Sequence, residues 1–153
     1  MKRLAIAALV TVVSAPIAAQ AVGPAAERGD ITITHGWFGS APHFPVFGFF
    51  TINNRGPNPL LITSWQSPAC RSLHLDEADG GGLDGMTIAS KSRMAFARGG
   101  YHLACDGPTD AVKVGTTVPV TIGFQNGRRI TAQFQIRDVS KLQQLVTKKI
   151  NVD

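Results

Sequence analysis

Hydrophobic and polar residues alternate along most of this chain, which is the pattern of β-strands with one buried face. Near the start, Ile31 and Ile33 alternate with Thr32 and Thr34. Further segments of this kind follow, and stretches rich in glycine, proline and asparagine separate them. The predicted strands are residues 30–38, 46–54, 60–67, 70–78, 86–90, 93–98, 99–105, 116–124 and 129–138.

Short strands at intervals of about 8–12 residues are typical of an all-β sandwich or barrel. The last two segments are joined by Asn126-Gly127, which is a strong signal for a β-hairpin. Two pairs of residues share one strand face and are expected to point into the core, namely Phe47 with Phe49 and Phe134 with Ile136.

The first 21 residues have the three parts of a secretory signal peptide. The basic residues Lys2 and Arg3 come first, an apolar run over residues 4–13 follows, and small residues lead to Ala21. This run is too short to cross a bilayer, which needs about 20 apolar residues. We therefore predict cleavage after Ala21, a periplasmic mature protein, and no insertion of the mature chain into the membrane.

The remaining chain has the length of one domain. The predicted division is a signal peptide at 1–21, a linker at 22–30, a β-domain at 31–138 and a tail at 139–153. In the tail, Val139, Leu142 and Leu145 have helical spacing, and Ser140 is placed to cap a helix. A short C-terminal helix and a frayed end both fit this pattern.

Charge and motifs exclude several classes of function. The formal net charge is +5, but the basic residues are scattered rather than gathered in a stripe, so we expect no nucleic-acid partner. The sequence contains no G-x-S-x-G, no H-E-x-x-H and no phosphate-binding glycine loop that leads into a helix. We therefore expect a protein that is not an enzyme.

Imidazole and sulfur side chains are the most suggestive chemical feature. Together these donors suit copper, and a thioether favours Cu(I) in particular. Met94 alternates with Phe96, which favours a place in the core instead. The complete set is His35, His43, His74, His102, Met86, Met94, Cys70 and Cys105.

Residues 31–138 resemble the PCu(A)C family of periplasmic copper chaperones. The segments that carry the likeness are "ITITHGWF", "FGFFTINNRGPNPLLITSWQSPAC", "LHL" followed by a methionine, "GGYHL" and "VGTTVPVTIGF". The resemblance implies a cupredoxin-like Greek-key β-sandwich with an exposed Cu(I) site. It also implies copper as the partner and delivery to cytochrome oxidase assembly, through an oxidase subunit or another copper chaperone.

The same resemblance implies a metal site formed by His74, Met86 and His102. Two methionines of the family pattern are replaced, because Leu75 and Ala104 stand in their places. The segment between Met86 and His102 is also shorter than in the family pattern. Such a site still suits Cu(I), and its two imidazoles also suit Cu(II). His35, His43 and Cys70 are candidate accessory ligands.

Cys70 and Cys105 are the two cysteines of the chain. If His74 and His102 face each other on antiparallel strands, the same register brings the cysteines within one residue of each other. That register and an oxidising compartment favour a disulfide. A thiol ligand and a redox pair are the alternatives, although the chain has no Cys-x-x-Cys motif.

Two hypotheses about function follow. The first is an exported copper-binding protein that acts as a Cu(I) chaperone or carrier. The alternative is a metal-free exported interaction or structural module that keeps the sandwich but has lost the copper site, as Leu75 and Ala104 suggest.

Overall fold

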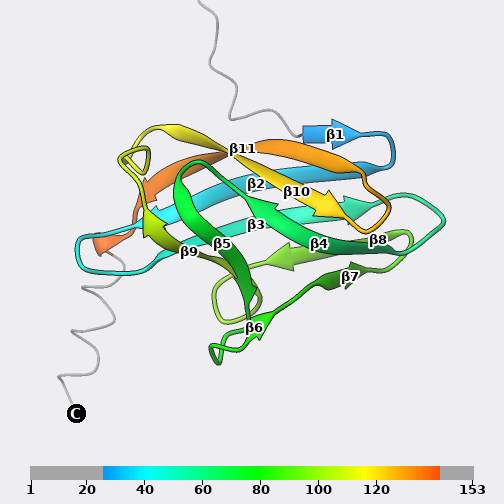
Figure 1. Cartoon of the computed structure of the whole chain (residues 1–153), viewed down its shortest axis with the longest axis horizontal. Coiled ribbons are helices and arrows are strands. Elements are labelled where there is room, and N and C mark those ends of the chain that lie inside the picture. The colour runs from blue at the N-terminus through cyan, green and yellow to red at the C-terminus, as the bar shows by residue number, and fades with distance from the viewer. Residues whose placement is uncertain (1–25, 142–153) are drawn as a thin grey trace, which may run out of the picture.

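Eleven strands build the part of the protein that the computed structural model describes, residues 26–141 (Figure 1). They form a nearly closed β-sandwich, so the predicted all-β fold is confirmed. The strands are β1 (Ala26–Arg28), β2 (Ile31–Ser40), β3 (Val46–Asn54), β4 (Leu60–Gln66), β5 (Cys70–Asp76), β6 (Gly82–Leu83), β7 (Met86–Ile88), β8 (Ser92–Phe96), β9 (His102–Pro108), β10 (Thr117–Phe124) and β11 (Arg129–Asp138).

The strand order is β6-β5-β9-β3-β2-β11-β10-β4-β7, with β1 on β2 and β8 on β3. β11 and β2 run parallel, and the other strand pairs among the described residues are antiparallel. β3 divides its partners along its length. Its first residues pair with β9, and its later residues pair with β8. The two ends of β3 therefore belong to different parts of the sheet, and β9, with β5 paired beside it, lies at the end where β3 begins (Figure 1).

The core lies between the layers and is rich in phenylalanine. Phe50 stacks on Phe96 with ring centroids 4.2 Å apart, and Phe134 is fully buried. The expected inward direction of Phe134 and Ile136 is confirmed. Phe49 is buried as expected, but it and Phe47 lie outside the main core cluster, whose members in β3 are Val46, Phe50 and Ile52. Phe47 and Phe49 face the other side, where both lie against the ring of His102.

The turn signals agree with the structure. Gly127 has a φ of 79°, a left-handed conformation that glycine adopts readily, and the Phe124 amide donates to the Arg128 carbonyl across the turn. Several predicted boundaries differ: β2 extends to Ser40, β5 ends at Asp76, and a turn over residues 97–100 precedes β9, which spans His102–Pro108 rather than 99–105.

Two of the predictions concern the ends of the chain, which lie outside the residues that the structure describes. The signal peptide at 1–21 and most of the tail lie outside the described residues. At the end of β11, the Asp138 carboxylate accepts the Ser140 amide at 2.9 Å; the predicted tail helix that Ser140 would cap continues outside the described residues. Among residues 26–141, no helix is long and apolar enough to cross a membrane.

Candidate metal site

β5 and β9 present a small grid of polar side chains on the face away from the core. The two strands are antiparallel, and Leu73, Leu75, Leu103 and Cys105 fill the opposite, buried face. Residues that share the outer face are paired across the strands as Ser72 with Asp106, His74 with Ala104, and Asp76 with His102.

This register brings the two predicted histidine ligands together, but not directly opposite each other. His102 pairs with Asp76 rather than His74, so the register is shifted by two residues from the predicted one. The histidines are instead diagonal neighbours on one face, a relationship that places the two residues about 7–8 Å apart, with their Cβ atoms somewhat closer. Two imidazoles at this spacing can reach a common ion from adjacent strands.

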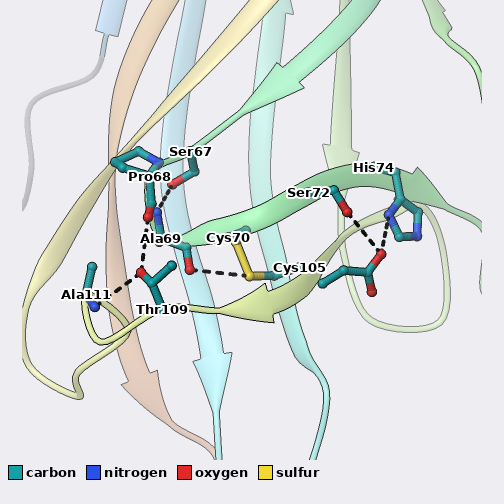
Figure 2. Close-up of a disulfide and its surroundings, with 10 residues drawn as sticks. Ser67, Pro68, Ala69, Cys70, Ser72, His74, Cys105, Thr109 and Ala111 are labelled. Carbon is teal, nitrogen blue, oxygen red and sulfur yellow. Dashed lines mark hydrogen bonds and ion pairs between the residues drawn. A yellow bond between two sulfur atoms is a disulfide. The ribbon is translucent and has the colours of Figure 1, made fainter.

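Two carboxylates hold the His74 imidazole. Its Nδ1 atom lies 3.2 Å from Asp106 Oδ2, and its Nε2 atom lies 3.4 Å from Asp76 Oδ1. The Ser72 hydroxyl donates to the same Asp106 oxygen at 3.3 Å (Figure 2). The side chain of His74 remains 41% exposed, so its ring is oriented yet accessible from solvent.

The His102 ring is held by a contact with the backbone of Gly100 and by neighbouring aromatic rings. Its Nδ1 atom lies 3.0 Å from the Gly100 carbonyl oxygen, which can only accept, so Nδ1 carries the proton in this contact. The ring packs edge-on against Phe47 with centroids 4.7 Å apart. An imidazole with Nδ1–H on a backbone carbonyl offers its Nε2 lone pair, which is the usual arrangement of a metal-binding histidine.

A pocket of about 410 Å³ opens beside His102 and Asp76. Phe47 and Phe49 form part of its apolar wall, and Glu77 and Arg98 also line it. An ion held near His102 would therefore lie between a polar strand face and an apolar wall.

The disulfide that the sequence favours is present. Cys70 and Cys105 are bonded with Cα atoms 5.4 Å apart, and both side chains are buried (Figure 2). Strict alternation would turn Cys70 to the same face as His74. Arg71 and Ser72 are both exposed, however, so the alternation breaks there and Cys70 turns inward. The sulfur of Cys70 is thus occupied, which removes the thiolate that an accessory ligand would need.

Met86 lies away from this grid. It begins β7, where it pairs with Ile62 of β4, and its side chain packs against the hydrophobic core. β6, which precedes it, pairs with the end of β5 through Leu83 and Leu75. The chain then leaves β5, so the structure does not place the predicted thioether beside His74 or His102.

His35 and His43 lie on other elements. His35 is exposed at the irregularity of β2, with its Nδ1 atom 3.0 Å from the Thr34 hydroxyl. His43 is exposed in the turn between β2 and β3. Both have a left-handed backbone, with φ of 56° and 65°. Neither belongs to the β5–β9 grid.

Sequence reasoning missed Asp76 and Asp106. Both share the strand parity of the nearest histidine, which is a signal the sequence does contain. Within residues 26–141, no three side chains of His, Cys, Asp or Glu converge as a metal cluster in this conformation. Binding through the grid therefore requires side-chain rotation.

Comparison with known proteins identifies a matching family model and solved structures with the same fold. The family model described as "LpqE-like: Putative lipoprotein LpqE-like" matches residues 31–136. No curated protein matches the sequence.

Solved structures of PCuAC domains share the architecture. The copper-bound PCuAC domain from PmoF2 is 20% identical with a TM-score of 0.66, covering 74% of this chain and 97% of that one. The apo form of the PmoF2 domain is 19% identical, has a TM-score of 0.67 and covers 76% of this chain and 97% of that one. The Cu(I) form of DR1885 from Deinococcus radiodurans is 20% identical with a TM-score of 0.57, covering 78% of this chain and 83% of that one. At these identities the likeness establishes a common fold.

Proposed function

The chain belongs to the LpqE-like family of putative lipoproteins, and from this premise we propose that it is an exported protein that binds copper and carries it in the periplasm. The observation that carries the proposal is the placement of His74 and His102 on one face of β5 and β9. Copper is the cargo, and the two imidazoles are its principal ligands. The protein has no catalytic role in this proposal.

The accessibility of the site supports a carrier. The His74 side chain is 41% exposed, and His102 lines an open pocket, so another protein can approach bound copper directly. The acceptor would be a cytochrome oxidase subunit or another copper chaperone, which the PCu(A)C resemblance suggests. Cu(I) is the form that this resemblance suggests for the cargo.

A copper titration tests the proposal. The purified protein is titrated with Cu(I) and with Cu(II), each against a competing chelator of known affinity. We expect the His74→Ala/His102→Ala double variant to lose tight binding. The matched control is His43→Ala, which removes an exposed imidazole outside the grid and leaves binding unchanged. Equal copper affinity in the double variant and the wild type would reject the assigned site.

A metal-free interaction module is the second candidate. It is favoured by the two carboxylates that already engage both nitrogens of His74, and by the lack of a converged metal cluster among the described residues. Under this alternative, His74 and its carboxylates form a polar surface for a protein partner. A wild-type protein that takes up no copper, yet captures a defined periplasmic partner through this face, would support the alternative.

A further inference from the structure

Asp76 occupies the position between the two histidines. It pairs directly with His102 across the strands, and it lies two residues from His74 on the same strand face. Its side chain is 18% exposed and lines the pocket beside His102. Of the four corners formed by His74, Ala104, Asp76 and His102, three carry atoms that can bind a metal.

The contact between Asp76 and His74 has the spacing of two ligands rather than of a strong hydrogen bond. Nε2 and Oδ1 are 3.4 Å apart, which is longer than the usual 2.7–3.2 Å of an N–H···O bond. Two donors that each bind one ion at about 2.0–2.1 Å lie about 2.9 Å apart at a right angle and about 3.4 Å apart at the tetrahedral angle. The observed separation therefore leaves room for an ion between the imidazole and the carboxylate.

Asp106 contacts the other nitrogen of the His74 ring, the one that does not face Asp76. Its Oδ2 atom lies 3.2 Å from His74 Nδ1 and accepts the Ser72 hydroxyl. A carboxylate on one imidazole nitrogen sets the orientation of the ring and strengthens the other nitrogen as a ligand. The His74 nitrogen that faces Asp76 is thus the one prepared for a metal.

Sulfur donors are lacking at the same place. Ala104 is opposite His74, Met86 packs against the core, and both cysteines are joined in the disulfide. The donors that remain are two imidazole nitrogens and a carboxylate oxygen. Such hard and borderline donors suit a divalent ion, and Cu(II) is bound most tightly among the divalent first-row metals.

We propose that Asp76 is the third ligand beside His74 and His102, and that the resulting site prefers Cu(II) over Cu(I). This inference rests on the proposed copper-binding function and changes the expected oxidation state of the cargo. Asp106 is a positioning residue, because it acts through His74. His74 already stands at ligand spacing from Asp76, so closure of the site needs the His102 ring to turn toward them, since the described residues show no converged cluster.

The test compares Asp76→Asn with the wild type in separate competition titrations with Cu(II) and Cu(I). Asparagine keeps the shape of the side chain but removes its charge and one oxygen. We expect Cu(II) affinity to fall by about tenfold or more, and Cu(I) affinity to change by less than about threefold. The matched control is Asp79→Asn, an exposed carboxylate in the turn after β5, which leaves both affinities unchanged.

Electron paramagnetic resonance of the Cu(II) form gives a readout that a structural role would not move. The spectrum of Asp76→Asn should differ from the wild type, whereas Asp76→Glu should retain Cu(II) binding because a carboxylate remains. Circular dichroism and the thermal midpoint of each variant establish that it is folded.

Two results separate failure of the inference from failure of the proposed function. If Asp76→Asn leaves the Cu(II) affinity and spectrum unchanged while His74→Ala/His102→Ala loses binding, Asp76 is not a ligand and the copper function stands. If the wild type binds neither Cu(I) nor Cu(II), the copper function and the inference both fail.

Discussion

Ala104 lies directly across from His74 in the β5–β9 pair, on the face that carries both candidate histidine ligands. The resemblance to copper chaperones places a methionine at this position. A methyl group there supplies no donor, and the neighbouring carboxylates Asp76 and Asp106 engage the imidazole instead. Position 104 therefore supplies no sulfur donor to His74, whose ring contacts carboxylate oxygens.

Replacing this alanine should move the site toward Cu(I). In Ala104→Met, a thioether would stand opposite His74, and soft sulfur ligands favour Cu(I). We expect Cu(I) affinity to rise by about tenfold, equivalent to about 1.4 kcal/mol, with little change for Cu(II). Competition with a Cu(I) chelator measures the effect. The control is Ala95→Met, at an exposed position of β8, and an equal gain in both variants would show that position 104 has no special role.

The disulfide should contribute substantially to stability. It joins residues 35 apart, and a loop of that length corresponds to about 3–4 kcal/mol in the chain-entropy model. We expect the free energy of unfolding of Cys70→Ser/Cys105→Ser to be lower than that of the wild type by this amount, so the variant should unfold at a lower urea concentration. The wild type under strong reducing agent should match the double variant. A change of less than about 1 kcal/mol would show that the closed loop adds little to folding.

The strands could be predicted from the sequence because their alternation and turns are local signals. Asn126-Gly127 and the parity of Phe134 and Ile136 needed no knowledge of distant contacts. Phe47 and Phe49 could not be assigned this way. β3 is apolar on both faces, since one faces the core and the other packs against Trp37 and His102, so parity alone does not identify the inward side.

The site depends on strand register, which local sequence does not determine. The predicted pairing of His74 with His102 was two residues from the observed one, and that shift put Asp76 opposite His102. The disulfide was nevertheless predicted, because the two strands pair over the same region. The break in alternation at Arg71 and Ser72, which turns Cys70 inward, has no signal that strand parity could supply.

An ion pair far from the site should control part of the acid sensitivity of folding. The Arg128 guanidinium donates to the Asp30 carboxylate at 2.8 Å, and this hydrogen bond lowers the pKa of Asp30 below its ordinary value of 3.8. A carboxylate with a lowered pKa stabilises the fold above its ordinary pKa, and that contribution is lost as the pH falls from about 3.8 through the lowered value.

We therefore expect Arg128→Gln to make stability less dependent on pH below about 4, because the largest cause of the lowered Asp30 pKa would be removed. Urea unfolding at pH values between 7 and 2 measures this slope. Lys113→Gln removes an exposed positive charge elsewhere and serves as the control. Identical slopes for Arg128→Gln and the wild type would mean that the ion pair has no influence on acid unfolding.

The close packing of β2 against β11 should make Gly36 intolerant of any side chain. A Cβ atom at this position would lie 2.6 Å from the ring of Phe134, which is fully buried and cannot move outward. Overpacking of this kind costs about 1–3 kcal/mol, so Gly36→Ala should lower the free energy of unfolding by that amount. Gly81→Ala is the matched control, because nothing lies within 4 Å of its Cβ position. Equal stability of the two variants would show that β2 can shift away from Phe134 at little cost.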